Sequence, residues 1–422
     1  MPPFASRMSR IRLSPASTLR AQAQALRATG RDVIALTAGD LDFPTPSHVL
    51  AAAHAAALRG ETKYTTVDGT AALKDAVRLK FRRENNLDYR RDEVVIANGS
   101  TQVIFNAFLA TVEAGDEVVV PRPSWEPYLD QVRLAGGDPV TIACASENGF
   151  RLRPEALDAA ITARTRWVVI NNPTNPTGVV YTGAELAALG KVLLAHPSVF
   201  VLADDLYEHI VFDGRRCETI AAVEPRLKSR TLTVNGVAKA YSMMGWHIGY
   251  GGGPAALIQE MVKVQSQSTS AASSIGQAAA LAALTGPQEL LAERAAALAQ
   301  RRDAFVARLN RCPGLSCAAP EGTFYLFVSC AGLIGRRRPG GKVIETDRDL
   351  AAYLLDAVDV AVVPGTDCGL PHYFRASFAL PQERLAEAAA RIERACGDLH
   401  APSHTGQGES HARIFPLYFA AR

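Results

Sequence analysis

Residues 234–250 read Val234-Asn-Gly-Val-Ala-Lys-Ala-Tyr-Ser-Met-Met-Gly-Trp-His-Ile-Gly-Tyr250, and Lys239 is the conspicuous residue in this stretch. Only eight of the 45 basic residues of the chain are lysines, and this one lies among small and apolar side chains directly after the β-like run 231–234. Burial lowers the pKa of a lysine and makes its amine nucleophilic, as Schiff-base formation with a carbonyl compound requires. The alternative is a solvated loop lysine, and this segment alone does not decide between the two.

The composition predicts an intracellular enzyme that binds neither nucleic acid nor a membrane. Of the 422 residues, 48% are hydrophobic, which is enough for a large core and two domains. The formal net charge is only +3, and the basic cluster Arg336–Arg338 is short and lies in a Gly/Pro-rich loop. No apolar stretch approaches membrane-spanning length, and Met1–Arg12 has no apolar core behind it, so we expect no secretory signal and a cytoplasmic location.

The cysteines fit a reducing compartment. They are odd in number, scattered, and without Cys-x-x-Cys spacing, which argues against a disulfide framework or a structural zinc site. We therefore predict no metal site. The seven are Cys144, Cys217, Cys312, Cys317, Cys330, Cys368 and Cys396.

Short apolar runs alternate with alanine-rich helical stretches through the middle of the chain. Continuous apolar character indicates strands buried on both faces, and helices between them imply crossovers in a mostly parallel, doubly wound sheet of an α/β fold. In such sheets ligands bind beyond the carboxyl ends of the strands, so the residues directly after each run are the candidates for a site. The expected strands are 94–97, 118–120, 140–143, 167–170, 199–203 and 231–234.

After Pro287 the pattern changes to that of a smaller α+β domain. We expect helices at 288–310, at 347–355 and from Pro381, and strands at 323–328 and 360–363. The expected divisions are an N-terminal arm (1–45, with a helix near 19–28) that packs with the smaller domain, a large domain (46–286), the smaller domain (287–398), and a partly flexible extension (399–422) whose apolar end is 414–419.

Polar residues follow three of the expected strands. The turn Asn98-Gly-Ser-Thr-Gln102 opens a helix, and its free backbone N–H groups and hydroxyls suit a phosphate, although any capped helix looks similar. The segment Asn171–Gly178 either only forms turns or places an asparagine side chain where it hydrogen-bonds a ligand oxygen. Asp204 ends a buried strand, where a carboxylate is costly unless it is paired. A protonated heteroaromatic nitrogen is one possible partner, and a helix N-cap is the alternative.

Together these segments resemble the fold-type I, pyridoxal-phosphate-dependent aminotransferases of class I and II, and most closely the bacterial aspartate/prephenate aminotransferase-like subgroup. The resemblance covers about residues 30–398 and rests on an ordered series of motifs. They are Thr62–Thr65 (TKYT), Pro121–Trp125 (PRPSW), Asn175–Gly178 (NPTG), Glu321–Tyr325 (EGTFY) and Tyr373–Phe378 (YFRASF).

The resemblance implies that the cofactor is pyridoxal 5'-phosphate and that Lys239 forms the internal aldimine with it, then shuttles the proton at the substrate α-carbon. Asp204 would pair with the pyridinium nitrogen, so that the ring accepts carbanion electrons. Asn175 and Tyr207 would hydrogen-bond the phenolic oxygen of the ring, with Asn175 also near the substrate, and Trp125 would stack on the ring.

The resemblance also implies how the phosphate and the substrate are held. Ser100 and Thr101 would bind the cofactor phosphate, and Tyr64 would reach that phosphate from the neighbouring subunit of a homodimer with shared active sites. Arg375 would clamp the α-carboxylate of an amino acid substrate through a bidentate pair, with the Gly39 backbone beside it.

Four positions depart from the family pattern. Ala238 and His247 stand where the family has a Ser and an Arg that bind the phosphate, and losing both would cost about 2–4 kcal/mol of cofactor affinity unless other groups replace them. His247 remains a candidate phosphate ligand. Thr101 stands where the subgroup often has a Lys for acidic side chains, which argues against aspartate and glutamate as first substrates. Thr366–Cys368 replaces a segment that commonly lines the substrate pocket.

The predicted function is an aminotransferase that acts through an external aldimine and a quinonoid. The alternative is another pyridoxal-phosphate reaction of specialised metabolism, namely elimination, replacement or carbon–carbon bond formation, for example on S-adenosylmethionine. The altered phosphate site favours that alternative. If the substitutions are only sequence drift within a working enzyme, they are compatible with an aminotransferase. A non-catalytic relative such as a regulator usually carries an N-terminal DNA-binding domain, and the residues before Phe43 leave no room for one.

Overall fold

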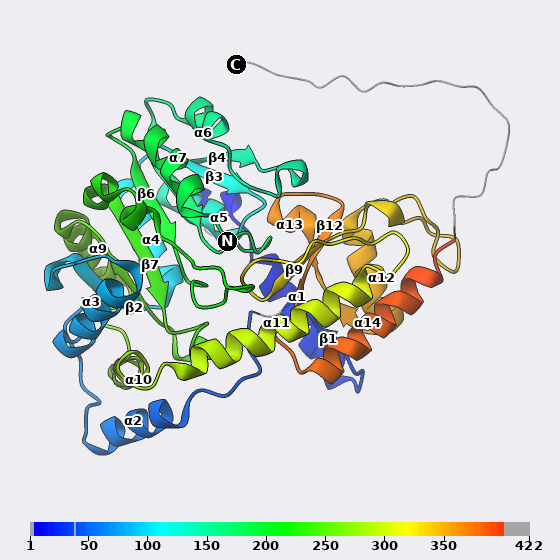
Figure 1. The fold of residues 1–422 in the computed structure, drawn as a ribbon, viewed down its shortest axis with the longest axis horizontal. Helices are drawn as coiled ribbons and strands as arrows, with labels where there is room; N and C mark the ends of the chain where they lie inside the picture. Colours follow the sequence, from blue (N-terminus) through cyan, green and yellow to red (C-terminus); the bar gives the residue numbers. More distant parts are fainter. Residues whose placement is uncertain (1–3, 38, 401–422) are drawn as a thin grey trace.

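A seven-stranded sheet lies at the centre of the computed structural model, which describes residues 4–37 and 39–400 (Figure 1). The strand order is β2-β8-β7-β6-β5-β3-β4, and every strand runs parallel to the others except β8, which is antiparallel to its neighbours β2 and β7. The strands are β2 (Val94–Asn98), β3 (Glu117–Arg122), β4 (Asp138–Ala143), β5 (Thr165–Asn171), β6 (Phe200–Asp204), β7 (Thr231–Gly236) and β8 (Ile248–Gly252). The predicted α/β fold with a mostly parallel sheet is confirmed.

Successive side chains of the strands pack into different apolar clusters, so both faces of the sheet are covered. Val118 and Val120 of β3 join one cluster, whereas Val119 between them joins another on the opposite face. One face is covered by α4 (Ser100–Thr111), α5 (Pro127–Ala135) and α9 (Ala255–Ser268). The other is covered by α3 (Ala71–Asn85), α6 (Pro154–Ala160), α7 (Gly183–Ala195), α8 (Ile220–Val223) and α10 (Ser274–Thr285), with α2 (Ser47–Leu58) packed on α10.

The strand β8 was not among the predicted strands, and its glycines explain both the omission and its position. Gly249 lies so close to the beginning of α4 that a Cβ atom there would stand 2.1 Å from the Ser100 backbone nitrogen. A Cβ at Gly252 would stand 2.5 Å from the Tyr89 ring. Glycine weakens a strand signal in the sequence, yet only glycine permits these close approaches.

The chain after α10 forms a second group of elements around its own apolar core. An antiparallel sheet of order β11-β12-β9 is accompanied by a short parallel pair of β1 and β10. The elements are β1 (Ile34–Ala35), β9 (Tyr325–Ser329), β10 (Val360–Ala361), β11 (Val363–Pro364), β12 (Tyr373–Ser377), α11 (Glu289–Leu309), α12 (Asp347–Val358), α13 (Gly365–Cys368) and α14 (Gln382–Gly397). The prediction of a single strand at 360–363 is wrong in one respect. The segment forms two short strands, β10 and β11, which belong to different sheets.

The N-terminal arm contacts both parts of the molecule. Its helix α1 (Pro15–Ala28) and strand β1 lie with the second group, where Arg31 pairs with Asp359 at 2.6 Å. The turn Ser6–Arg10 instead lies against α5, and Arg10 donates a hydrogen bond of 3.0 Å to Asp138. The long helix α11 runs from the large sheet across to the second group (Figure 1). The predicted domain boundaries at 45/46 and 286/287 stay predictions.

The predicted C-terminal extension begins with two packed residues. Leu399 is buried, and the backbone of His400 exchanges hydrogen bonds of 2.9 and 3.0 Å with Arg337. The apolar segment 414–419 lies outside the described residues. In the two described ranges of the chain, no helix has both the length and the apolar character needed to cross a membrane. The short 3₁₀ turns are 6–10, 91–93, 146–148, 225–230, 244–246 and 331–333.

Candidate active site

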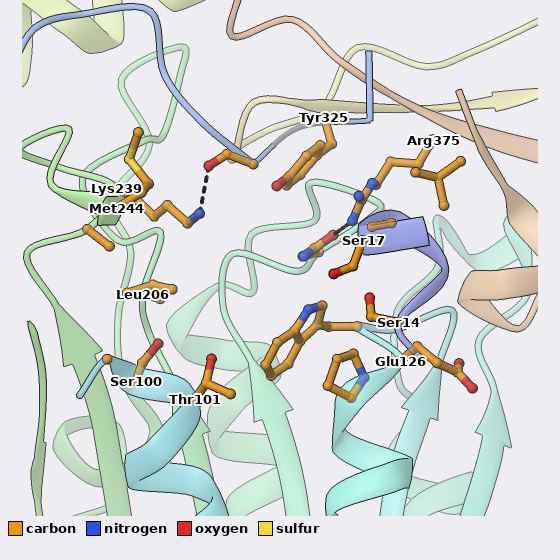
Figure 2. Close-up of a pocket in the computed structure, with 18 of the residues that line it drawn as sticks. Ser14, Ser17, Ser100, Thr101, Glu126, Leu206, Lys239, Met244, Tyr325 and Arg375 are labelled. Atoms are coloured by element: carbon orange, nitrogen blue, oxygen red, sulfur yellow. Dashed lines mark hydrogen bonds between the residues drawn. The ribbon is translucent and has the colours of Figure 1, made fainter. Parts of the chain in front are cut away.

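A cavity of about 410 Å³ opens where the carboxyl ends of β5, β6 and β7 meet the beginning of α4 (Figure 2). Lys239 and Arg375 enter it from opposite sides with Tyr325 between them, and Ser100 and Thr101 lie at the beginning of α4 (Figure 2). Its lining includes all the predicted site residues except Tyr64, which are Gly39, Ser100, Thr101, Trp125, Asn175, Asp204, Tyr207, Lys239, His247 and Arg375. The strand-end rule therefore identified the correct edge of the sheet.

Lys239 lies in the connection between β7 and β8, and its ammonium group is directed into the cavity. Its Nζ donates a hydrogen bond of 2.8 Å to the Gly39 backbone oxygen and lies 5.8 Å from the centre of the Tyr207 ring and 5.7 Å from that of Phe324. The side chain forms no ion pair with a carboxylate of the described residues. It is therefore a cavity amine held by one carbonyl group and two ring faces, and not a solvated loop lysine.

Asp204 ends β6 with its carboxylate buried at the cavity wall. It accepts hydrogen bonds from the Tyr128 hydroxyl and, at 3.3 Å, from the Leu206 backbone N–H. No helix begins at this residue, so it is not a helix N-cap. Burial raises the pKa of Asp204, and the hydrogen bond from Tyr128 opposes that rise. A cationic ring nitrogen beside the carboxylate would favour its ionised form, which fits the role that the family resemblance implies.

Removing the Tyr128 hydroxyl is expected to shift the pH dependence of the enzyme. In Tyr128→Phe, burial still raises the pKa of Asp204 while the opposing hydrogen bond is gone, so that pKa rises further. More of the carboxyl is then protonated at a given pH, and the acid limb of the kcat/KM profile moves to higher pH, with activity recovering as the pH is raised. The measurement is kcat/KM from pH 5 to 9, with Tyr353→Phe as control because that hydroxyl bonds Ala395 outside the cavity. An acid limb in the same place as in the wild type would contradict this account.

Tyr207 and Arg375 meet at Tyr325, which was quoted in a sequence motif but not predicted as a site residue. The Tyr207 and Tyr325 hydroxyls lie 3.4 Å apart, and the Arg375 guanidinium stacks 4.4 Å from the centre of the Tyr325 ring. Burial raises the pKa of Tyr207 well above its usual value, so its hydroxyl keeps its proton and remains available as a donor.

Arg375 is a buried cation that lacks a carboxylate partner in the described part of the chain. It is 6% exposed, its Nη1 donates to Asn175 Oδ1 at 3.1 Å, and its Nη2 donates to the Thr37 backbone oxygen at 3.2 Å. Its Nε has no hydrogen-bond partner among the described residues. A buried guanidinium with an unused donor is a costly arrangement that a ligand carboxylate would complete.

The beginning of α4 has the geometry of a phosphate site. The first N–H groups of a helix lack intrahelical acceptors, and the residue before this helix, Gly99, offers no side chain to cap them. Ser100 and Thr101 add their hydroxyls. A Cβ atom built on Gly99 would stand 3.7 Å from His247 Nδ1, so the imidazole lies beside this helix end. A helix N-terminus, a cavity lysine, and a buried carboxylate with a tyrosine donor together fit pyridoxal phosphate.

The structure shows what stands at the two altered phosphate positions. Ala238 lines the cavity with a methyl group that cannot donate a hydrogen bond, and His247 lines it as an exposed side chain. We expect His247→Arg to bind the cofactor about tenfold to a hundredfold more tightly, because an arginine adds a permanent charge and further donors. The measurement is the dissociation constant of the apoprotein for pyridoxal phosphate by fluorescence quenching. His54→Arg makes the same change at an exposed site on α2, and equal affinities in all three proteins would show that His247 does not reach the phosphate.

Several cavity residues were not predicted. Tyr128 lies three residues after Trp125, and that spacing is the one signal in the sequence that points to it. Thr37 contributes its backbone oxygen to Arg375. The N-terminal end of α1 also lines the cavity, with Ser14, Ser17 and Arg20, and no local pattern could have placed that distant segment here.

The altered segment Thr366–Cys368 lines the cavity in part. Asp367 and Cys368 belong to the lining, and the buried Asp367 carboxylate forms an ion pair with Arg348. Thr366 instead hydrogen-bonds the Asp347 carboxylate through both its backbone N–H and its hydroxyl, each at 2.7 Å. These bonds fix the segment within the second group of elements, and the Cys368 backbone oxygen also accepts a hydrogen bond of 3.0 Å from the Ser124 N–H.

Tyr64 lies outside the cavity of its own chain. Its side chain is 96% exposed, which is unusual for a tyrosine. Its predicted role concerns a neighbouring subunit and stays a prediction.

Comparison with known proteins gives a consistent result over nearly the whole chain. The family model for aminotransferase class I and II matches residues 31–392. An aspartate aminotransferase of Rhizobium meliloti strain 1021 is 53% identical over 395 residues, which cover 94% of this chain and 96% of that protein. An aspartate/prephenate aminotransferase of Cereibacter sphaeroides is 50% identical over 392 residues, which cover 93% and 98% of the two chains.

Solved structures agree with the sequence comparison. The crystal structure of the aspartate aminotransferase from Rhizobium meliloti has a TM-score of 0.91 at 53% identity and covers 94% of this chain and 99% of that one. The aspartate aminotransferase from Thermus thermophilus with maleate has a TM-score of 0.87 at 38% identity, covering 94% and 100%.

Proposed function

This chain belongs to the class I and II aminotransferase family, a pyridoxal-phosphate-dependent group, and we propose that its cavity transfers the amino group of an amino acid to a 2-oxo acid through Lys239 and Arg375. One observation carries the proposal. A cavity amine and a buried guanidinium without a carboxylate partner in the described chain face each other across a single cavity. An α-amino acid presents an amine and a carboxylate to just such a pair.

Pyridoxal phosphate, when bound, supplies a carbonyl group that takes up the amino group and a ring that accepts the electrons left at the substrate α-carbon. Ser100, Thr101 and the first N–H groups of α4 would hold its phosphate, with His247 beside them. Asp204, held by Tyr128, would keep the ring nitrogen protonated.

The protein groups orient the substrate and move its proton. Arg375 would bind the α-carboxylate through guanidinium N–H groups that Asn175 and Thr37 leave free, while these two residues keep the guanidinium in place. Lys239 would take the proton from the substrate α-carbon and later give it up again, so that one amine serves as base and then as acid. Gly39 carries the carbonyl group that accepts a hydrogen bond from the free amine.

Thr101 lines the cavity at the position where the subgroup often has a lysine for acidic side chains. Apart from Lys239 and Arg375, the arginine that lines the cavity is Arg20, which pairs with Asp40 at 3.2 Å, and the imidazole there belongs to His247. We therefore propose that neutral side chains are accepted at least as well as acidic ones, although the relatives carry the name aspartate aminotransferase.

A half-reaction tests the proposed function. The reconstituted protein is mixed with single L-amino acids (aspartate, alanine, phenylalanine and arginine), without any 2-oxo acid. We expect one equivalent of the matching 2-oxo acid per chain and loss of the visible absorption, which a 2-oxo acid then restores. Release of ammonia or of a side-chain leaving group instead would support the elimination or replacement alternative and overturn the proposal.

We also propose a cytoplasmic homodimer in which Tyr64 of each chain completes the cavity of its partner. The exposure of Tyr64 supports this, as do the exposed apolar side chains of the N-terminal arm and α2, namely Phe4, Met8, Leu13, Leu50 and Leu58. Sedimentation should give twice the chain mass of 45.1 kDa.

A further inference from the structure

Lys80 of α3 is a buried lysine outside the cavity. Its side chain is 0% exposed, and its ammonium group donates hydrogen bonds to the Glu208 carboxylate and, at 2.7 Å, to Asn85 Oδ1. The Glu84 carboxylate lies 3.5 Å from the same nitrogen. A fully buried charge needs partners of this kind, but Glu208 is also the chain neighbour of the cavity residue Tyr207, and that position calls for a further explanation.

A metal site is the first alternative. Glu84, Glu208 and His209 have ligand atoms close enough to share an ion. The Lys80 ammonium, however, already supplies the positive charge to both carboxylates. Burial opposes ionisation of Glu84, but the hydrogen bond from His209 and the Lys80 charge lower its pKa to about 2. Burial also opposes ionisation of Glu208, and the Lys80 charge nevertheless holds its pKa below the usual value. The cluster is therefore a satisfied ion-pair network.

The Glu208 carboxylate joins three segments of the chain. Besides Lys80 of α3, it accepts hydrogen bonds from Asn85 at the end of α3 and from Asn235 Nδ2 of β7 at 2.7 Å. Glu208 itself directly follows Tyr207 in the turn after β6.

Two of these segments carry residues of the active site. The turn after β6 directly follows Asp204, and the connection after β7 contains Lys239 three residues beyond the strand. The two strands pair up to Asp204 and Val234. Beyond that pair, the hydrogen bond between Asn235 and Glu208 joins the turn to the segment that leads into the lysine.

We propose that Glu208, fixed by Lys80, is a positioning residue that sets Asp204 and Tyr207 relative to Lys239. Its carboxylate touches neither substrate nor cofactor and acts through the two backbone segments. A buried ion pair adds little net stability compared with apolar residues of similar volume. In this proposal its effect is instead to favour one arrangement of the segments that it joins. Displacements of about 1 Å among reacting groups cost about a hundredfold in rate. The inference rests on the proposed roles of Asp204, Tyr207 and Lys239.

The variant Asn235→Leu tests the inference, since it removes the link to β7 and leaves the Lys80–Glu208 pair intact. We expect kcat to fall about tenfold or more, with KM for the amino acid within about twofold of the wild type. We also expect a shift of about one unit in the pH midpoint of the visible absorption of the resting holoenzyme. A merely structural role would lower the melting temperature and leave the midpoint and kcat unchanged, and that result would overturn the proposal.

Glu84→Gln is the matched control. This residue contacts Lys80 and His209 in the same cluster but belongs to α3 and makes no hydrogen bond to β7 among the described residues. We expect a changed melting temperature with the wild-type midpoint, and an equal shift in both variants would refute the link through Asn235. If Asn235→Leu does not fold, Asn235→Ser replaces it, because the shorter hydroxyl side chain does not reach Glu208. A wild type that yields no 2-oxo acid refutes the proposed function, whereas an active wild type with an unshifted Asn235 variant refutes only the positioning role.

Discussion

Replacing Lys239 by alanine is expected to lower the rate of amino transfer by about 10⁴-fold or more. The substitution removes both the amine that would bind the cofactor covalently and the group that would move the proton at the substrate α-carbon. The cavity keeps its other residues, so phosphate contacts at α4 and the Asp204 carboxylate would still retain the cofactor by noncovalent contacts. The measurements are kcat in steady state and the visible spectrum of the dialysed protein.

Lys263→Ala is the matched control for this substitution. Lys263 is 71% exposed in its side chain, pairs with Glu260 on α9, and does not line the cavity. It should retain the wild-type kcat and spectrum. A Lys239→Ala protein with more than about a tenth of the wild-type kcat would exclude Lys239 as the proton-transferring group, because such groups contribute at least about a hundredfold.

Arg375→Lys is expected to lower kcat/KM for amino acids by about a hundredfold, equivalent to about 2.7 kcal/mol. The lysine keeps a positive charge but loses the planar fork that presents two parallel donors to a carboxylate. It also loses the stacking on Tyr325 and the fixed bonds to Asn175 and Thr37. Most of the loss should appear as a higher KM, since the clamp already binds the carboxylate before the chemical step.

A substrate without the carboxylate isolates this contact. With the wild type, kcat/KM for the amide of an amino acid should be lower than kcat/KM for the amino acid itself. The factor should be about the same as the one by which Arg375→Lys lowers kcat/KM for the amino acid. When the amide is used with Arg375→Lys, the two losses should not add. Arg384→Lys, at a partly exposed arginine that pairs with Asp32 away from the cavity, is the control. Losses that add fully would mean that Arg375 does not contact the α-carboxylate.

The sheet was predictable where the sequence pattern is itself a consequence of burial. Val118–Val120 and Val199–Ala203 are continuous apolar runs, and in the structure their side chains pack on both faces of the sheet. The strand β8 lacks this pattern, because Gly249 and Gly252 must make room for Ser100 and Tyr89. Those neighbours are distant in the sequence, and the requirement for glycine becomes visible only after folding.

The cavity was predictable where a residue lies at or soon after the end of a strand. Asp204 is the last residue of β6 and Lys239 lies three residues after β7, and parallel strands bring their carboxyl ends together. The resemblance to the family added Arg375, which no strand-end argument could have placed, and the structure puts it in the same cavity.

The residues that support the cavity were not predictable. Tyr128 is one of several tyrosines in the chain, and its partner Asp204 lies 76 positions away. The contact of Glu208 with Lys80 spans 128 positions and depends on how α3 packs behind the sheet. A buried lysine and a buried glutamate have no periodic signature, so only the folded chain shows that they meet.

Borohydride reduction of the holoenzyme followed by peptide mass spectrometry tests the central claim most directly, because reduction makes the attachment between a lysine and the cofactor permanent. The account predicts one equivalent of cofactor per chain, located on Lys239 in the peptide that contains Val237–Ser242. Attachment to any of the other seven lysines, or no attachment in a protein that retains the cofactor, would contradict it.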